Sequence, residues 1–373
     1  MVENIGIVGG GQLGRMLTEA AQPLGFHVTV VDPTPNCPAA QVGAEQIKAD
    51  LKDEVAVSEL ADKTNVITWE IEHINANHLK TLVSLGHVVE PNPDTLITIQ
   101  DKYWQKELLR TNGLPVADYH LIPNDEWLSA WQSPDRLGHR MIIKSAIGGY
   151  DGRGNLVYNG QTVNELREVL GEHIYAETIV DFDRELSVIA ARDTRGNIAV
   201  YPTVETVHED NICHTVVSPA NIEPEVNKEA QEIAHETLRF LGGAGVFAIE
   251  MFVSNNGVLI NEIAPRVHNS GHHTIEANVT SQFEQHIRAI TGMPLGSTAM
   301  RVSAAVMINI LGKREHPLTR EGIDKVLALP DTHPHFYGKS SRKARKIGHI
   351  TVLADTTNEA MSRAKTARKA LEV

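Results

Sequence analysis

A lysine followed by a glycine-rich loop is the first group of residues in this chain whose types and spacing could do chemistry. Lys144 ends the apolar run of residues 141–143, and four glycines lie between residues 148 and 154. A lysine on a strand supplies a point charge, while a flexible loop with many free N–H groups can fold over a polyphosphate. No Gly-Lys-Ser/Thr sequence closes the loop, so it is not a Walker loop. A hairpin turn is the structural alternative, but such a turn seldom needs four glycines, and we predict a lid that closes over phosphates.

Two glutamates form the second group. Glu250 lies in a predicted strand over residues 246–254, Glu262 lies in another over 258–263, and the intervening Asn-Asn-Gly suits a three-residue hairpin loop. In that register residue 254 faces 258, so Glu250 faces Glu262. Two opposed carboxylates on an apolar sheet repel unless a cation lies between them, and oxygen ligands beside phosphates indicate Mg²⁺. The alternative is a different register that leaves one glutamate exposed.

A second glycine motif lies near the start of the chain. Gly9, Gly11 and Gly14 follow an apolar strand and precede a helix predicted over residues 15–24, and Asp32 ends the next strand. This is the context of a dinucleotide-binding turn, although glycines before a helix can serve any phosphate. A turn that only packs the helix on the strand is the structural alternative. We predict phosphate binding without a dinucleotide, because the lid and the glutamate pair do not fit a dehydrogenase.

Two other stretches carry weaker signals. Residues 177–180 have the form of a strand end whose backbone could bind an adenine edge, and Glu185 could accept from ribose hydroxyls. Residues 339–346 contain five basic side chains. Such a run is usually a solvated loop, and without interleaved aromatics it favours a small phosphorylated ligand over nucleic acid. None of the eighteen histidines lies in a His-Glu-x-x-His motif, so we expect structural roles for them.

Composition limits the class of protein. A chain of 373 residues with 42% hydrophobic and 22% charged side chains suits two or three folded domains and excludes disorder. The net charge of −13 disfavours a general nucleic-acid or membrane binder. Two cysteines cannot form a disulfide framework, and no run of about 18 apolar residues or signal-like start occurs. We therefore expect a soluble protein in a reducing, cytoplasmic setting.

The order of predicted elements indicates a parallel α/β domain that ends near the prolines at 91 and 93. Its further strands are expected at 66–69 and 88–89. Asp94 is expected to cap one helix that runs through residues 102–110 and stops at Gly113. The later expected elements are a small strand-rich lobe, a helix at 163–170, a strand at 174–179, a β-rich stretch at 186–217, a helix at 226–241 and a terminal helix from about 359.

The chain order of lysine, lid, acidic hinge and paired glutamates resembles that of an ATP-grasp ligase. Four longer motifs narrow the resemblance: GGQLGRM at residues 10–16, GGYDGRG at 148–154, NEIAPRVHNSGH at 261–272 and RKIGH at 345–349. Together they look like the 5-(carboxyamino)imidazole ribonucleotide synthase family, the ATPase-subunit type of purine-biosynthetic carboxylase. The similarity spans residues 6–349.

This resemblance implies an ATP-grasp fold of the α/β and α+β classes. A Rossmann-like pre-ATP-grasp domain is expected over 1–100, an ATP-grasp domain over 101–300 with a lid lobe at about 114–176, and a small C-terminal β-rich domain over 301–373. The implied reaction joins bicarbonate to the exocyclic amine of 5-aminoimidazole ribonucleotide through carboxyphosphate, while ATP becomes ADP and phosphate. ATP and Mg²⁺ are the implied cofactors. A homodimer is expected, with no nucleic-acid or membrane partner.

The resemblance also implies roles for residues of each motif. The expected ATP-binding residues are Lys102, Lys144, Gly149, Tyr150, Asp151, Gly152, Arg153, Gly154, Asn155, Glu177, Thr178, Ile179, Val180, Glu185, His208, Asn261 and Glu262. The expected ribonucleotide-binding residues are Gln12, Leu13, Glu70, Tyr150, Arg153, Lys339, Arg342, Arg345 and Lys346, with Glu72 as a weaker candidate. Glu250 and Glu262 are expected to bind Mg²⁺. The expected catalytic residues are Lys144, Asp151, Arg266 and Asn269, the last two steadying bicarbonate or carboxyphosphate.

Three rival functions stay open at this stage. An NAD(P)-dependent dehydrogenase would use the first glycine turn and Asp32, but it leaves the lid and the paired glutamates unexplained. A formate-dependent transformylase of the same ATP-grasp type differs only in the acid that it activates. A non-catalytic nucleotide sensor would bind without turnover, against which Lys144, Glu250 and Glu262 argue.

Overall fold

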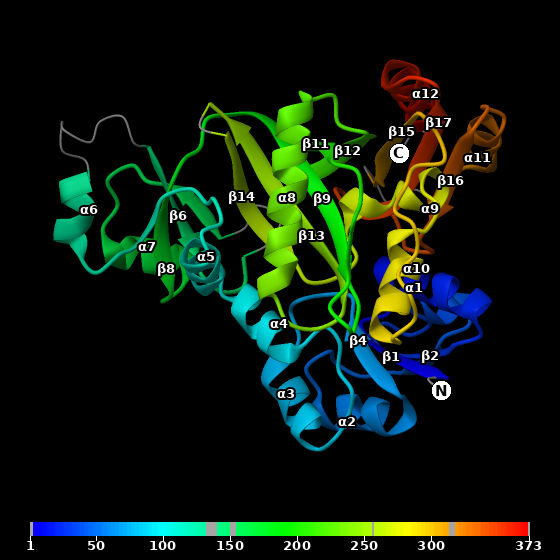
Figure 1. Cartoon of the computed structure of the whole chain (residues 1–373), viewed down its shortest axis with the longest axis horizontal. Helices are drawn as coiled ribbons and strands as arrows, with labels where there is room; N and C mark the ends of the chain where they lie inside the picture. The colour runs from blue at the N-terminus through cyan, green and yellow to red at the C-terminus, as the bar shows by residue number, and fades with distance from the viewer. Residues whose placement is uncertain (1–2, 132–139, 150–153, 256, 313–317, 372–373) are drawn as a thin grey trace.

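The computed structural model describes residues 3–131, 140–149, 154–255, 257–312 and 318–371. Figure 1 shows a long central sheet with three bodies around it. The N-terminal domain, in blue, lies below the sheet, a small lobe in teal and green lies to its left, and the C-terminal helices and strands, in orange and red, lie at the upper right. Among the described helices, none is both long and apolar enough to cross a membrane.

The N-terminal domain is built on a parallel sheet, as the sequence predicts. Its strands follow the order β3-β2-β1-β4. Its elements are β1 (Asn4–Val8), α1 (Gln12–Ala21), η1 (Gln22–Leu24), β2 (His27–Val31), β3 (Glu45–Ile47), α2 (Glu54–Lys63), β4 (Val66–Trp69) and α3 (Ala76–Ser84). The strand predicted at 66–69 is confirmed, whereas the one at 88–89 is reduced to a bridge between Ile67 and Val89. Patterning misses β3 because its three residues are exposed or only half-buried.

The helix predicted after this domain is two helices, α4 (Pro93–Gln100) and α5 (Lys102–Thr111). The prediction that Asp94 caps the first helix is wrong: the side chain of Asn92 accepts from the Asp94 N–H, and Pro93 occupies the first helical position. Asp101 has an extended backbone and caps α5 by accepting from Tyr103 N–H. Because of this break, Lys102 lies in the first turn of a new helix.

The segment that joins the domains is pinned against a glycine turn of the central body. A carboxylate oxygen of Glu90 accepts from the Ala244 N–H at 2.5 Å. The Thr95 hydroxyl donates to the Gly242 carbonyl and accepts from the Gly242 N–H. The boundary between domains is therefore a packed contact.

The small lobe is a second sheet with the strand order β5-β8-β6-β7. Its elements are β5 (Tyr119–Leu121), α6 (Asp125–Trp131), β6 (Met141–Ser145), β7 (Asn155–Val157), α7 (Val163–Leu170) and β8 (Ile174–Thr178). The prediction of α7 is confirmed, and Thr162 with Glu165 forms a capping box at its start. The Ser145 N–H donates to the Gly154 carbonyl, so the two ends of the glycine-rich loop lie together at the edge of this sheet.

The central sheet has the order β14-β13-β9-β11-β12-β15-β17-β16, with β10 paired to β9. The elements of its first part are β9 (Phe182–Arg192), β10 (Ile198–Val200), β11 (Val204–Glu209), β12 (Ile212–Ser218), α8 (Pro224–Phe240), β13 (Gly245–Ser254) and β14 (Gly257–Ala264). Residues of β13 alternate between two cores: Phe247 and Ile249 pack with α8, whereas Val246 and Ala248 pack with α1 and α10 (Gln282–Ile290). Glu250 continues the second series, on the face away from α8.

The C-terminal strands continue the central sheet, because β15 pairs with β12. The remaining elements are η4 (Asn269–Gly271), α9 (Thr274–Ala277), β15 (Ala304–Leu311), α11 (Arg320–Leu327), β16 (Thr332–Phe336), β17 (Lys346–Ala354) and α12 (Thr357–Ala370). The helix predicted from about residue 359 begins at Thr357. Its buried alanines pack with Ile308, Ile350 and Val352 in one core.

The hairpin of β13 and β14 pairs the two glutamates as predicted, but in a different strand register. Glu250 lies opposite Glu262, but Ser254 lies opposite Gly257 rather than residue 258. The register shifts by one residue beyond Met251, so Asn261 is the extra residue of a β-bulge. The predicted pair is confirmed, and the predicted loop register is wrong.

The docked glycine turn gives a stability prediction. A Cβ on Gly243 (φ +89°) would lie 2.0 Å from the Asn92 nitrogen, whereas a Cβ on Gly86 (φ +99°) would meet nothing within 4 Å. Gly86→Ala should lower the free energy of unfolding by about 1–2 kcal/mol through backbone strain alone. Gly243→Ala should add an overpacking cost of about 1–3 kcal/mol. Urea unfolding measures both, and equal losses would contradict the packing of residues 90–95 on this turn.

Candidate active site

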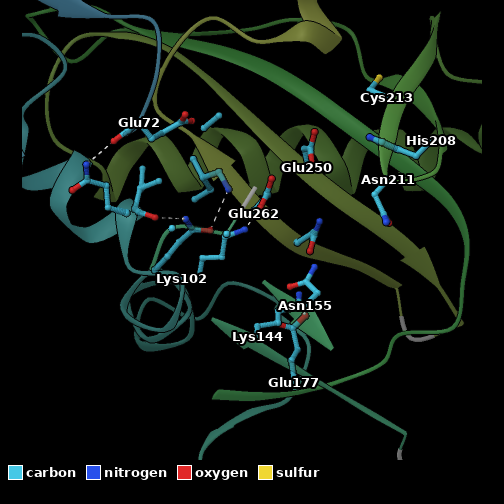
Figure 2. A pocket seen from close by; sticks show the side chains of 18 of the residues that line it. Glu72, Lys102, Lys144, Asn155, Glu177, His208, Asn211, Cys213, Glu250 and Glu262 are labelled. Carbon is cyan, nitrogen blue, oxygen red and sulfur yellow. Dashed lines mark hydrogen bonds and ion pairs between the residues drawn. The ribbon is translucent and has the colours of Figure 1, made fainter. Parts of the chain in front are cut away.

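A cavity of about 1000 Å³ lies where the lobe, the central sheet and the N-terminal domain meet. The residues predicted for a site that line it are Lys102, Lys144, Gly149, Asn155, Glu177, Thr178, Ile179, Val180, Glu185, His208, Glu250, Asn261, Glu262, Arg266, Asn269 and Lys346, together with Glu72. In Figure 2, Lys102 and Glu262 lie near its centre, Lys144 and Glu177 at one side, and His208 at another. The cavity therefore unites most of the residues predicted for ATP and metal binding.

A buried carboxylate of the lobe, Glu177 in β8, pairs with two lysines. Lys144 Nζ lies 2.9 Å from Glu177 Oε1, and Lys106 Nζ lies 3.0 Å from Glu177 Oε2. Burial alone would raise the pKa of Glu177, but the two ammonium groups outweigh it and hold that pKa below its ordinary value. The Glu177 carboxylate therefore positions the two lysines. Of the stretch predicted to bind adenine, this leaves residues 178–180 to contact the base. Lys106 was not predicted from the sequence, although it lies one helical turn after Lys102 and so on the same face of α5.

One member of the glutamate pair forms an ion pair with a lysine. Lys102 Nζ lies 2.7 Å from Glu262 Oε2 and holds the pKa of Glu262 below its ordinary value. Burial and then the charge of Glu262 raise the pKa of Glu250 to about 7. The pKa values of the two carboxylates are thus shifted in opposite directions although the side chains lie opposite each other, which is the expected result of like charges sharing one site.

The pair supplies oxygen ligands of the type that Mg²⁺ takes. In the described part of the chain, no three His, Cys, Asp or Glu side chains gather as a metal site. A cation between Glu250 and Glu262 would complete its coordination with other oxygens, such as those of phosphate, water or amide groups. The amide of Asn261, which the bulge adds between Ile260 and Glu262, also lines the cavity.

The wall of the cavity opposite the lobe carries an arginine and an asparagine. Arg266 Nε lies 2.8 Å from Glu72 Oε1, and its Nη1 donates to the Val267 carbonyl. Burial alone would lower the pKa of Arg266, but Glu72 outweighs it and raises the pKa. Asn269 exchanges two hydrogen bonds with Asn309 of β15. These side chains present fixed donors at the cavity wall.

A histidine and a glutamate pair lies at the far end. His208 Nδ1 lies 2.7 Å from Glu185 Oε2. Burial would lower the pKa of His208, but Glu185 outweighs it and raises the pKa above the ordinary 6.5. Nearby, the rings of Phe182 and Phe252 stack with centroids 4.5 Å apart and line the cavity. Neither ring was predicted for the site. An aromatic residue in a predicted strand can pack in a core or line a cavity, and the sequence pattern does not distinguish the two.

The residues predicted for the ribonucleotide are divided. Lys346 lines the cavity, whereas Gln12, Leu13, Glu70, Lys339, Arg342 and Arg345 do not belong to its described lining. Lys339 and Gln12 nevertheless form a hydrogen bond across 327 positions of sequence, so the basic run does reach the first glycine turn. Arg342 is exposed and Arg345 donates to the Ser340 carbonyl. Leu13 is packed in the core, which removes its side chain from the predicted ligand contacts.

The first glycine turn is already occupied by carboxylates of the chain. Glu70 accepts from the N–H groups of Gly11 and Gly14 at 2.5 Å each. Asp32 accepts from the Gly10 N–H and is buried. Asp32 therefore closes the turn instead of facing a ribose, which argues against the dinucleotide alternative. The predicted phosphate contact at this turn would have to use the Gln12 side chain and Lys339.

The tip of the predicted lid lies outside the described residues. The predictions for Tyr150, Asp151, Gly152 and Arg153 concern this tip. Of the flanking residues, Gly149 and Asn155 line the cavity, whereas Gly154 does not appear in its described lining.

Comparison with known proteins decides the family. Three family models match the chain in order: the ribonucleotide synthetase preATP-grasp domain over residues 2–100, the ATP-grasp domain over 107–283 and the phosphoribosylaminoimidazole carboxylase C-terminal domain over 305–363. N5-carboxyaminoimidazole ribonucleotide synthase of Brucella melitensis is 40% identical over 359 residues, which cover 95% of this chain and 97% of that protein. The chain belongs to the N5-carboxyaminoimidazole ribonucleotide synthase family.

Solved structures of this family agree with the fold. N5-carboxyaminoimidazole ribonucleotide synthetase from Thermotoga maritima is 42% identical with a TM-score of 0.87, over 99% of this chain and 98% of that one. A synthase from Aspergillus clavatus, solved with ADP and 5-aminoimidazole ribonucleotide, has a TM-score of 0.89 at 36% identity, over 99% and 98%. The ATP-grasp fold and the family expected from the motifs are confirmed. This chain spans about two thirds of the length of fungal relatives such as the phosphoribosylaminoimidazole carboxylase of Ogataea methanolica, which is 40% identical over 96% of this chain.

The shared carboxylate gives a prediction about Lys106. Lys106→Met leaves Glu177 with Lys144 alone, so Lys144 should stay paired with it and bind a phosphate less well. We expect a loss of about 3 kcal/mol in the free energy of unfolding, because one partner of a buried ion pair is removed. ATP affinity should fall as well, measured by calorimetric titration. Lys228→Met removes an exposed pair with Glu232 and is the control; an equally small effect of both variants would contradict the role of Lys106.

The His208 pair gives a pH prediction. Because the folded pKa of His208 is raised, the pair stabilises the fold fully below the ordinary pKa and loses this effect as the pH rises through the raised value. Glu185→Gln should therefore cost more free energy of unfolding at pH 6 than at pH 9. Glu205→Gln breaks the Arg184–Glu205 pair, which contains no histidine, and is the control. An equal cost of Glu185→Gln at both pH values would show that His208 is neutral in the folded protein.

Proposed function

We propose that this chain makes N5-carboxyaminoimidazole ribonucleotide from 5-aminoimidazole ribonucleotide, bicarbonate and ATP. The observation that carries the proposal is the facing of Glu250 and Glu262 beside Lys102, Lys144 and Arg266 in one cavity. That arrangement concentrates charges of both signs where a metal-bound triphosphate and a second anion would meet. Membership of the family then selects the substrates.

ATP has a complementary place in this cavity. The stacked rings of Phe182 and Phe252 and the strand end at residues 178–180 give an apolar wall for a purine. Glu185, which now pairs with His208, would accept from ribose hydroxyls. Relatives solved with ATP or with ADP support nucleotide binding at such a site. Lys144 and Lys102, which now pair with glutamates, would turn to the phosphates.

Mg²⁺ fits the donor set of this chain. Glu250 and Glu262 would hold it, and when bound it would neutralise charge on the transferred phosphate. Binding a cation requires Glu250 to be ionised, although its pKa in the free protein is raised to about 7. Lys102, which already pairs with Glu262, would limit repulsion between the carboxylates until the nucleotide arrives.

The chemical step joins two anions. A bicarbonate oxygen attacks the γ-phosphorus of ATP, the bond to the bridging β-phosphate oxygen breaks, and ADP leaves, which forms carboxyphosphate. The exocyclic amine then attacks the carboxyphosphate carbon, phosphate leaves, and the amine gives up one proton. Arg266 and the N–H of Asn269 would hold the bicarbonate and the labile intermediate at the buried wall, away from water.

The ribonucleotide is the least defined partner of the site. Its phosphate would meet Lys346 at the cavity edge and the linked Gln12 and Lys339 beyond it. A relative solved with ADP and 5-aminoimidazole ribonucleotide supports this substrate. The contacts predicted for Tyr150, Asp151 and Arg153, the homodimer and the cytoplasmic setting stay predictions.

An omission experiment tests the proposed reaction. ADP release, followed by a coupled assay, should need ATP, Mg²⁺, bicarbonate and 5-aminoimidazole ribonucleotide together, and leaving out any one should reduce it at least tenfold. Glu262→Gln should abolish release because it removes a metal ligand, whereas Glu232→Gln on the exposed face of α8 should not change it.

The same assay separates the rival functions. Release that responds to formate instead of bicarbonate would indicate a transformylase. Nucleotide binding without release under any mixture would indicate a sensor. Release that the ribonucleotide does not increase would refute the substrate assignment.

A further inference from the structure

We infer that Asn309, in the C-terminal part of the chain, is a positioning residue that fixes the amide of Asn269 with an N–H toward the bicarbonate site. This inference rests on the proposed function, in which Asn269 holds the bicarbonate. Asn309 itself is fully buried and does not line the cavity, so it acts only through its neighbour.

The two amides form a reciprocal pair. Asn269 Nδ2 donates to Asn309 Oδ1 at 3.0 Å, and Asn309 Nδ2 donates to Asn269 Oδ1 at 2.6 Å. Each amide has two N–H groups and one oxygen, so the pair uses one N–H of each residue. Asn269 is 8% exposed and lines the cavity, and its second N–H is the donor left for a ligand.

A backbone carbonyl decides which way round the pair lies. Asn309 Nδ2 also donates to the Cys213 carbonyl of β12 at 2.8 Å. Turning the amide of Asn309 over would bring its oxygen against this carbonyl oxygen at a fully buried side chain, where an unpaired polar group is costly. The orientation of Asn309 is therefore fixed by β12, and the orientation of Asn269 is fixed by Asn309.

The orientation decides the sign of charge that meets the anion. With the observed pairing, Asn269 offers an N–H, which attracts bicarbonate or carboxyphosphate. With its amide turned over, Asn269 would offer its oxygen, which repels an anion. It would also face Asn309 with oxygen against oxygen and nitrogen against nitrogen.

The scaffold around Asn309 suits this role. β15 is paired on both sides, to β12 and to β17, and Asn309 lies directly opposite His349 of β17. Asn269 lies in a short helical turn between the central sheet and α9 and has no strand to hold it. Asn309, on a strand paired on both sides, thus orients the side chain of Asn269 in the connecting segment.

The test compares Asn309→Ala with Ile308→Ala. Ile308 is the preceding residue of β15 and is buried in a core whose members do not line the cavity, so it controls for loss of stability. Asn309→Ala should raise the KM for bicarbonate about tenfold, the loss expected for about one hydrogen bond. The KM for ATP should stay within twofold for both variants, and Ile308→Ala should leave both constants unchanged while lowering Tm.

A double variant separates positioning from a structural effect. In an Asn269→Ala background, Asn309→Ala should change the KM for bicarbonate less than twofold further, because the donor that it orients is gone. The inference would be overturned if Asn309→Ala raised the KM for bicarbonate as much in the Asn269→Ala background as in the wild type. It would also be overturned if Asn309→Ala raised the KM for bicarbonate and the KM for ATP equally. If Asn309→Ala does not fold, Asn309→Ser, which removes the amide and keeps a small, uncharged polar side chain, should show the same selective change in the KM for bicarbonate, and an unchanged value would overturn the inference. Wild-type ADP release that ignores bicarbonate would instead refute the proposed function and is seen before any variant is made.

Discussion

Two like charges facing each other across a hairpin are the constraint on which the rest of the site depends. Glu250 and Glu262 repel in a sheet that is otherwise apolar, and the fold tolerates them because Lys102 lies against one and the other takes up a proton readily. Two neighbouring charges of the cavity are paired in the same way: Glu177 is shared by lysines and Arg266 is paired with Glu72. These charges are therefore neutralised by one another in the free protein, and ligands would replace such internal partners.

The architecture brings these partners together from all parts of the chain. Lys102 comes from the start of α5, the glutamates from the last hairpin of the central sheet, and Lys144 from the small lobe, which has a sheet of its own. The C-terminal strands share the central sheet, so the residues that they contribute are fixed relative to the glutamates. Lys144 stands on a separate sheet, and its distance to the glutamates depends on how that lobe is seated.

Sequence patterns predicted the chemistry of the site better than its geometry. Alternation identified the two strands and hence the pair of Glu250 and Glu262, but the loop register was wrong and a bulge at Asn261 restored the pairing. A bulge adds a single residue to a strand and does not repeat along the sequence, so the alternation of hydrophobic residues does not predict it. Lys106 follows from helical spacing once its neighbour is known. Asn309 reads as one polar residue in a buried strand, because its partner is 40 positions away and no local pattern links the two.

The carboxylate of Glu70 in the first glycine turn changes how that motif should be understood. It occupies the N–H groups of Gly11 and Gly14, the place where a pyrophosphate binds in a dinucleotide fold. A group tethered to the protein competes at an effective concentration on the order of millimolar or higher. A free dinucleotide would therefore have to break both hydrogen bonds before its pyrophosphate reached these N–H groups. The turn keeps the form of a nucleotide site while a side chain of the protein already takes up its donors.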